Sequence, residues 1–405
     1  MQNLNENNAM YTTTCPACGM LCDDVSPTKT SCEKSIAFFS QANKATDPRS
    51  FGRTVSLDQA VIKIADLIKL AKQPLIGGLG TDLTGFRAAY ELANKCNATL
   101  AHMNAAATWR NTKVLQSVGW QTTTMTEVRN RADVIVFIGT DVIKHNPRFF
   151  ERVIWPKETM FVENENRDIT YLGAENLDTS HGVSPKGNKP TVLPCNQEQL
   201  PQVTAALHAL VANKKLNVSS VAGIALADLE NLANRLKQAK YATLIWVAKD
   251  LDFPHAELTI QQITQTVVDL NKTTRAGALA MGGSDGDTTV NYAHTWLSGL
   301  AIHQEVLPEH DVLVWVNSFS PDKELPSTKA PTIVIGNSNM HFESEPDVYI
   351  PIATPGLDCN GTMIRVDSNV ILPFKKVKES SLPTLTEVLQ QVEAAVLKAS
   401  SQEAP

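Results

Sequence analysis

SLDQAVIKIADLIKLAKQPLIGGLGTDLTG, residues 56–85, contains the pattern that decides the fold. Its first half places apolar residues at helical spacing behind Ser56, a favourable N-cap, with Asp58 in the first turn. The apolar run PLIGGLG (74–80) then predicts a buried strand that leads into a glycine turn. A further helix is expected around 84–95. The stretch therefore predicts a helix, a strand and a helix in succession.

The same alternation recurs along the rest of the chain. Short apolar runs predict strands at 132–140, 159–165, 241–248, 275–281, 311–317 and 331–337. Helical spacing predicts helices near 198–213, 223–239, 255–270 and 288–300. Alternating strands and helices are typical of parallel sheets with helices packed on them. We therefore expect an α/β protein with doubly wound parallel sheets.

Three consecutive segments differ in character. Residues 1–50 are polar and contain a cysteine cluster, which predicts a small Cys-rich metal-site segment of the iron–sulfur type. Residues 51–345 predict an α/β, Rossmann-like body made of two subdomains. Residues 346–405 change to short strands and turns, which predicts a β-rich closing segment, with a final helix near 383–398.

Composition narrows the class of protein. The chain has 405 residues, of which 43% are hydrophobic and 19% charged, as expected of a globular protein with a large core. Its formal net charge of −6 provides no broad basic surface, so neither nucleic acid nor an anionic membrane is expected as a partner. No apolar run reaches the roughly 18 residues that span a bilayer. The opening residues MQNLNENNAMYTTT lack the features of an export signal, so we expect a cytoplasmic protein with reduced thiols.

Four cysteines lie close together near the start of the chain. TTTCPACGMLCDD (12–24) has the spacing C-x2-C-x3-C, and a further cysteine follows: the four are Cys15, Cys18, Cys22 and Cys32. Four converging thiolates can hold a [4Fe-4S] cluster or a tetrahedral zinc ion, and the spacing does not choose between them. Buried cysteines without a metal are the alternative, because a cysteine thiol often packs as a small apolar group. The remaining cysteines, Cys96, Cys195 and Cys359, are isolated and are expected in the core.

Several stretches together resemble a known family. CPACGMLCDDV resembles the cluster motif of the formylmethanofuran dehydrogenase B subunit, a member of the molybdopterin oxidoreductase superfamily. Three later stretches are similar to other parts of that protein: 115–152, 290–299 and 347–373. The resemblance implies a formate dehydrogenase-like fold over most of the chain. The family usually separates its third and fourth cysteines by a longer hairpin than this sequence provides.

The resemblance also implies which catalytic groups to look for. In active members, tungsten or molybdenum lies between two pterin dithiolenes and is ligated by a cysteine or selenocysteine that a histidine follows. Counting back from Leu115, these positions fall on Ala107 and Thr108. A methyl group cannot ligate the metal, and His102 reaches this role only by a shift of register; an ordinary buried histidine is the alternative. The family's active-site arginine is also missing from MGGSDGDTTVNYAH (281–294).

These departures predict that the redox reaction and the molybdopterin or tungstopterin are lost. The sequence resembles the non-redox B subunit of the bacterial formyltransferase/hydrolase complex, which converts formyl-tetrahydromethanopterin to formate in methylotrophic one-carbon oxidation. Its expected partners are the other subunits, especially the hydrolase subunit, and a methanofuran-type carrier. Any metal kept by the cysteines would be structural. The alternative is an active tungsten or molybdenum formylmethanofuran dehydrogenase B subunit, an oxidoreductase.

Two kinds of further candidate site remain. The glycine turns GLGTDLTG (78–85) and AMGGSDGD (280–287) follow expected strands, where α/β proteins bind ligands. They are interpreted either as remnants of pterin-phosphate loops or as plain strand-to-helix turns. A basic set could meet an anionic carrier or an acidic partner, or could form a solvated charged face. It consists of Arg129, Arg131, Lys144, His145 and Arg148.

Overall fold

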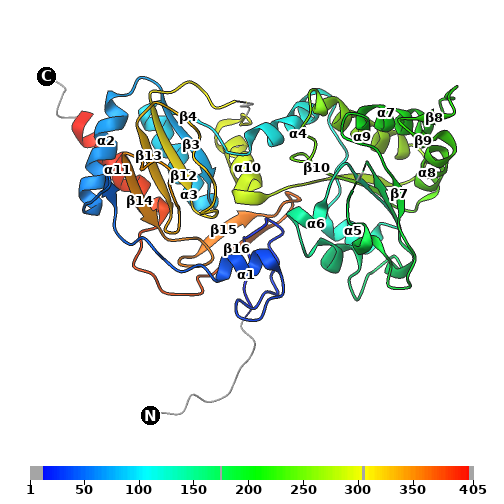
Figure 1. Cartoon of the computed structure of the whole chain (residues 1–405), viewed down its shortest axis with the longest axis horizontal. Coiled ribbons are helices and arrows are strands. Elements are labelled where there is room, and N and C mark those ends of the chain that lie inside the picture. The colour runs from blue at the N-terminus through cyan, green and yellow to red at the C-terminus, as the bar shows by residue number, and fades with distance from the viewer. Residues whose placement is uncertain (1–11, 174–175, 303–305, 401–405) are drawn as a thin grey trace, which may run out of the picture. The chain divides into compact units, whose positions relative to one another are not determined.

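The computed structural model describes residues 12–173, 176–302 and 306–400, and divides the chain into two compact units (Figure 1). Unit 1 comprises Met1–Ala105, Gly283–Arg365 and Val370–Pro405. Unit 2 comprises Ala106–Gly282 and Val366–Asn369. The opening residues MQNLNENNAMYTTT, in which we found no features of an export signal, lie mostly outside the described ranges. No helix in those ranges has the length and apolar character needed to cross a bilayer.

Unit 1 is built on a seven-stranded sheet in the order β2-β1-β14-β13-β12-β3-β4. The strands are β1 (Arg49–Ser50), β2 (Arg53–Thr54), β3 (Pro74–Gly80), β4 (Thr99–Leu100), β12 (Val312–Asn317), β13 (Thr332–Asn337) and β14 (Val348–Ile352). Neighbours from β14 to β4 pair in parallel, whereas β1 pairs antiparallel with both β14 and β2. Strands from both ends of the chain therefore share one sheet.

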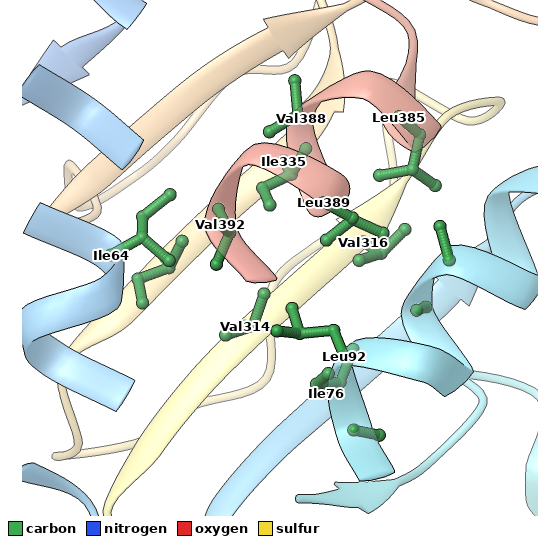
Figure 2. Close-up of a cluster of buried hydrophobic side chains, with 14 of the residues drawn as sticks. Ile64, Ile76, Leu92, Val314, Val316, Ile335, Leu385, Val388, Leu389 and Val392 are labelled. Atoms are coloured by element: carbon green, nitrogen blue, oxygen red, sulfur yellow. The ribbon is translucent and has the colours of Figure 1, made fainter. Parts of the chain in front are cut away.

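The main core of unit 1 lies between this sheet and its helices. These are α2 (Leu57–Leu70), α3 (Leu83–Cys96), α10 (Asp287–Ser298) and α11 (Leu385–Ser400). Figure 2 shows side chains of α2, α11 and β12, among them Ile64, Leu389 and Val314, turned toward one another. Helix α2 begins at the expected cap: Ser56 and Gln59 form a reciprocal capping box.

Loops cover the opposite face of the seven-stranded sheet. Trp315 and Tyr349 point to this face and form a cluster with residues from connecting segments, including Leu325 and Phe342. Here loop residues occupy the position that helices hold in a doubly wound sheet. Because these loops bury the sheet's aromatic residues, Tyr349 is fully covered without a second helical layer.

Unit 2 is built on a five-stranded parallel sheet in the order β11-β10-β5-β6-β7. The strands are β5 (Val134–Ile138), β6 (Asp168–Leu172), β7 (Thr191–Leu193), β10 (Ala242–Val247) and β11 (Ala276–Met281). One core cluster joins this sheet to α7 (Leu200–Val211), α8 (Leu226–Gln238), α9 (Ala256–Leu270) and α4 (Ala105–Ser117). Phe137 on β5 instead contacts the rings of Phe149, Phe150 and Tyr171.

Shorter elements complete the described chain. The helical ones are α1 (Glu33–Phe39), α5 (Met125–Arg131), α6 (Val142–His145), the π-helix η1 (Phe150–Ile154) and the 3-10 turns η2 (Asn164–Asn166), η3 (Ser180–Gly182) and η4 (Ser284–Gly286). Two hairpins pair β8 (Ser220–Val221) with β9 (Ile224–Ala225) and β15 (Gly361–Ile364) with β16 (Ile371–Phe374). The hairpin of β15 and β16 supplies the β character expected after residue 346.

Two sequence-based expectations differ from this architecture. The strand predicted at 159–165 was wrong: those residues form bends and the start of η2, and the strand is β6, at Asp168–Leu172. The predicted segments 1–50, 51–345 and 346–405 do not coincide with the two units, because β1 pairs with β14 across the sequence while 106–282 closes a sheet of its own. Parts of the first and third segments, 1–11 and 401–405, lie outside the described residues.

Candidate functional site

Each parallel sheet has one point where the order of its strands reverses. In unit 1, the chain adds β4 on one side of β3 and β12, β13 and β14 on the other. In unit 2, it adds β6 and β7 on one side of β5 and β10 and β11 on the other. In open α/β sheets, ligands bind at the carboxyl ends of the strands at such switch points. The candidate sites are therefore the residues that follow β3 and β12, and those that follow β5 and β10.

Buried polar side chains mark the switch point of unit 1. Thr81 follows β3, Asn317 ends β12 and Ser318 follows it; all three are almost fully buried. The Ser318 N–H donates to the carbonyl of Gly80 at 2.6 Å, which ties the two strand ends together. The Asn317 amide donates to the Ser320 carbonyl at 2.7 Å and accepts from the Ser320 N–H at 3.2 Å. The amide of Asn317 therefore shapes its own loop.

GLGTDLTG (78–85) forms a strand-to-helix turn. Asp82 is the N-cap of α3 and accepts hydrogen bonds from the Gly85 N–H at 3.0 Å and the Thr84 hydroxyl at 2.8 Å. Its second oxygen also accepts from the Thr362 N–H at 3.2 Å. The carboxylate thus closes a helix and anchors the β15 segment. These contacts favour the plain-turn interpretation of this motif.

The second glycine turn packs directly on the first. A Cβ placed on Gly286 would lie 2.2 Å from the carbonyl oxygen of Thr81, so only glycine fits there. The neighbouring Asp285 has a left-handed backbone (φ 58°) and is 8% exposed. Its carboxylate accepts from the Ser320 hydroxyl and, at 3.4 Å, from the Asn104 amide. The turn therefore fills part of the switch point with protein backbone.

The cysteine motif reaches the same turn. A Cβ placed on Gly19, whose φ is +74°, would lie 2.3 Å from the carbonyl oxygen of Gly283. The backbone at Gly19 therefore touches the second glycine turn, which in turn touches Thr81. Three motifs that the sequence offered separately lie together in unit 1.

His102 is hydrogen-bonded at both ring nitrogens. Its Nδ1 accepts from the Asn104 N–H at 2.9 Å, which requires the neutral ring with the proton on Nε2. Nε2 then donates to the Asp285 carbonyl at 3.3 Å. The ring is 7% exposed, two residues beyond β4. This is the geometry of a buried structural histidine, and the replacement-ligand hypothesis finds no support in it.

The predicted metal cysteines occupy one compact turn. Cys15, Cys18 and Cys22 are buried and Cys32 is partly exposed. The Cys15 N–H donates to the Cys22 carbonyl at 2.9 Å. Burial, with the adjacent Cys18 and Cys32, raises the pKa of the Cys15 thiol to about 12, although the Ala17 N–H opposes this.

The predicted metal site is not tested by the placement of these thiols. Within the described ranges, no three His, Cys, Asp or Glu side chains converge as ligands of one ion. Metal binding by Cys15, Cys18, Cys22 and Cys32 therefore stays a prediction. What holds the segment here is an apolar cluster that sequence reasoning missed. It contains Leu21, Phe38, Phe319, Leu357, Met363 and Phe374.

The expected ligand position lies near the start of α4. Ala107 and Thr108 are half-buried in its first turns, and the Thr108 carbonyl accepts from the Thr112 hydroxyl at 3.0 Å. The nearest cysteine in sequence, Cys96, ends α3, and its thiol donates to the Leu92 carbonyl at 3.0 Å. Burial raises the pKa of that thiol. Neither position offers a thiolate to a catalytic metal.

Asp250 organises the switch point of unit 2. It follows β10 and bonds the His145 Nε2 at 2.7 Å, the Asp141 N–H at 3.2 Å and the Thr140 hydroxyl. Burial acts to raise the pKa of Asp250, but the hydrogen bonds from His145, Thr140 and Asp141 outweigh it and lower the pKa. Sequence reasoning noted His145 and missed Asp250. The sequence feature that could have identified Asp250 is its position, three residues beyond the end of the apolar strand β10.

Several of the basic residues have acidic partners within unit 2. Arg131 pairs with Glu127 at 2.8 Å and lies over the Phe161 ring. Arg148 makes a two-pronged contact with Glu151. His145 is bonded to Asp250. These pairs favour the charged-face interpretation over a site for an anionic carrier.

The geometry above defines a mixed α/β protein with two parallel sheets, each with a polar switch point. No family model matches the chain. Its sequence is 23% identical to the B subunit of tungsten-containing formylmethanofuran dehydrogenase 2 of Methanocaldococcus jannaschii, over 90% of this chain and 92% of that protein. It is 24% identical to the Fhc B subunit of the formyltransferase/hydrolase complex of Methylorubrum extorquens, over 83% and 93%. The chain is thus a homologue of proteins named as the B subunits of formylmethanofuran dehydrogenase and of Fhc, as the sequence motifs predicted.

Solved structures share the fold. A chain of the Methylorubrum extorquens formyltransferase/hydrolase complex FhcABCD, crystallised with methylofuran, matches with a TM-score of 0.71 at 21% identity, over 87% of this chain and 99% of that one. Acetylene hydratase from Pelobacter acetylenicus matches with a TM-score of 0.62 at 9% identity, over 95% and 69%. At such identities the matches establish the mixed α/β fold with parallel sheets. The expected fold class is confirmed at that level.

Proposed function

We propose that this chain is the non-catalytic B subunit of a cytoplasmic formyltransferase/hydrolase complex that converts formyl-tetrahydromethanopterin to formate. One observation carries the proposal. This chain, a homologue of the Fhc B subunit, has Ala107 at the position where a redox-active relative requires a cysteine or selenocysteine ligand. Without that ligand, two-electron chemistry on a formyl group loses its metal centre. The formyl transfer and hydrolysis then belong to other subunits.

The contacts at the unit 1 switch point support a structural role. Gly286 packs against Thr81, Asp285 bonds Ser320, and both ring nitrogens of His102 are engaged. These groups are used to hold loops together, which is what a scaffold needs. In the proposed complex the chain positions the hydrolase subunit and borders the path of a methanofuran-type carrier.

Affinity purification tests this proposal. The tagged chain is isolated from its native cells under mild conditions, and co-purifying chains are identified and quantified by mass spectrometry. We expect formyltransferase and hydrolase subunits in fixed stoichiometry, with formate released from formyl-tetrahydromethanopterin. A chain that is isolated without either subunit would contradict the proposal. An unrelated tagged protein of similar size serves as the control for non-specific capture.

The tungsten-containing relatives favour a second candidate function, that of an active formylmethanofuran dehydrogenase B subunit. This candidate requires stoichiometric tungsten or molybdenum and two pterins per chain. Elemental analysis of the anaerobically purified complex, together with pterin release, distinguishes it from the first. We expect neither tungsten nor molybdenum. Stoichiometric tungsten or molybdenum together with released pterin would contradict the proposed non-catalytic role and would support the oxidoreductase instead.

A further inference from the structure

Four exposed cations lie in the turns at one edge of unit 2. Lys240 and Arg275 come just before β10 and β11, and Lys214 and Lys215 follow the end of α7. We name these four residues the basic edge. Asp250 and the switch point that it organises lie beyond the carboxyl end of β10. The basic edge is therefore a separate surface of the same unit.

Hydrogen bonds hold these turns side by side. The Lys237 ammonium donates to the Asn213 side chain at 3.0 Å, which joins the turn after α7 to the end of α8. The Thr274 hydroxyl donates to the Ala239 carbonyl, which joins the turn after α9 to the turn after α8. The basic edge therefore consists of three adjoining turns, one after each of the helices α7, α8 and α9.

Other charged groups nearby are engaged within the chain. Lys237 also donates to the Leu210 carbonyl at 3.2 Å, and Lys272 pairs with Asp269. Asp133 accepts from two backbone N–H groups just before β10, at 2.9 Å each. By contrast, within the part of the chain that the structure describes, no carboxylate forms an ion pair with any cation of the basic edge.

The ends of the helices do not account for these cations. A cation stabilises the C-terminal end of a helix chiefly from within its last turn. The last turns of α7 and α8 already contain His208, Arg235 and Lys237. The basic edge lies beyond those turns, on a chain whose formal net charge is −6. Its positive charge is therefore available to a group outside the chain.

We propose that the basic edge is a docking surface for an acidic segment of a different subunit of the complex, an inference that rests on the proposed function. Opposite charges on two proteins steer their association and exclude wrong partners. Nucleic acid fits less well, because proteins that bind it are usually basic overall and stack aromatic side chains on its bases. Tyr241, the aromatic residue of these turns, instead donates its hydroxyl to Thr123 within unit 2.

Symmetry distinguishes a different subunit from a second copy of this chain. Most homodimers are two-fold symmetric, and their interface joins the same patch of both copies. Two basic edges that faced each other would bring like charges together, which opposes association. The partner that fits is therefore an unlike chain with carboxylates at its surface.

Charge reversal within the assembled complex tests this inference. The variant combines Lys214→Glu, Lys240→Glu and Arg275→Glu. Each tagged chain is purified with its partner subunits at a series of salt concentrations, and the retained subunits are quantified by mass spectrometry. We expect the variant to bind one subunit roughly tenfold or more weakly than wild type at low salt. The difference should shrink as salt screens the charges.

A control variant has the same change of net charge elsewhere. It reverses three exposed cations of unit 1, in the combination Lys95→Glu, Lys329→Glu and Lys375→Glu. This control should retain every subunit that wild type retains. Thermal unfolding checks that all variants are folded, and glutamine replaces glutamate at the three positions of the basic edge if charge reversal destabilises the chain.

The outcomes separate this inference from the proposed function. Equal retention by wild type and by the folded basic-edge variant would overturn the inference and leave the proposed function standing, as would equal losses in the control variant. If wild type retains neither formyltransferase nor hydrolase subunits, the proposed function fails and the inference with it. A variant that loses bound nucleic acid or a second copy of the chain, in place of a different subunit, would also overturn the inference.

Discussion

Asp250 is a residue on which several hydrogen bonds at the unit 2 switch point converge. It joins Thr140 and Asp141, which follow β5, to His145 on α6 and to its own position after β10. Because a half-buried carboxylate with several donors is stabilised in its ionised form, the contacts lower its pKa. The folded state therefore gains stability from Asp250 above its unfolded pKa of about 3.9, and loses it as the pH falls through the lower folded value.

Asp250→Asn is expected to destabilise the protein by about 1–3 kcal/mol at pH 7, because charge-assisted hydrogen bonds to His145 and Thr140 are lost. The difference from wild type should shrink at acidic pH, as the pH falls through the lowered folded pKa of Asp250 and the wild-type carboxyl is protonated as well. Urea unfolding at neutral and at acidic pH measures it. Asp252→Asn is the control, since Asp252 is largely exposed in its pair with Arg110 and should change stability little. An Asp250→Asn effect of equal size at both pH values would contradict the assignment.

At the scale of elements, one buried arginine binds backbone carbonyls at the C-terminal ends of two helices. Arg167 is 4% exposed, and its guanidinium donates to carbonyls of Val128 and Arg129 in α5 and of Val153 and Ile154 in η1. Carbonyls at the C-terminal end of a helix lack most of their intrahelical partners, although the Val128 carbonyl also accepts from the Ala132 N–H at 3.3 Å. Burial lowers the pKa of Arg167 to about 10, which keeps it charged at neutral pH.

Arg167→Lys is expected to cost about 2–4 kcal/mol of unfolding free energy, because a single ammonium cannot reach carbonyls on two helices. Chemical denaturation of the purified chain measures the loss. Arg129→Lys, an exposed arginine in α5, should stay within about 0.5 kcal/mol of wild type. If both substitutions have the same small effect, the capping role is wrong.

The cysteine segment is a second element whose support can be tested. Phe38 is 4% exposed within the apolar cluster that joins this segment to the β15–β16 hairpin. Phe38→Ala should therefore cost about 3–5 kcal/mol and expose the segment to proteolysis. A strong metal chelator tests the predicted metal site separately, and an unchanged unfolding midpoint of wild type would show that the apolar cluster alone holds the segment. Limited proteolysis and thermal unfolding, with and without chelator, measure both effects. Cleavage in residues 12–40 on chelation alone would show that a metal holds the segment.

At the scale of the whole molecule, local sequence patterns predicted most of the strands. They did not predict the contacts between residues that are distant in sequence. Strands such as β5, β10 and β12 were found because parallel strands buried on both faces are continuous apolar runs. The strand at 159–165 was misplaced, because Met160 and Phe161 are apolar yet exposed. At the site, the glycine turns were found, but their convergence with the cysteine motif depends on tertiary packing. The roles of Asp250 and Arg167 depend on partners that are distant in sequence.

The division into units predicts an autonomous fragment. Residues 106–282 contain a complete five-stranded sheet, its helices and its own hydrophobic cluster. The short return at Val366–Asn369 adds the bond from the Met125 N–H to Asp367 at 2.9 Å. We expect the isolated fragment to fold cooperatively, at a cost of about 1 kcal/mol for that lost cap. Circular dichroism during thermal unfolding measures this. A non-cooperative transition would show that the fragment depends on the rest of the chain.

The pairing of β3 with β12 also has a consequence for synthesis on the ribosome. Strand β3 ends at Gly80, but its partner begins at Val312, after all of 106–282 has been made. At about 5–20 residues per second, the emerging β3 and its helices wait roughly 10–50 seconds without that neighbouring strand. Unit 2 can fold during that interval, whereas the apolar strand of unit 1 stays exposed to aggregation. Production of this protein should therefore depend on chaperones that shield a nascent chain.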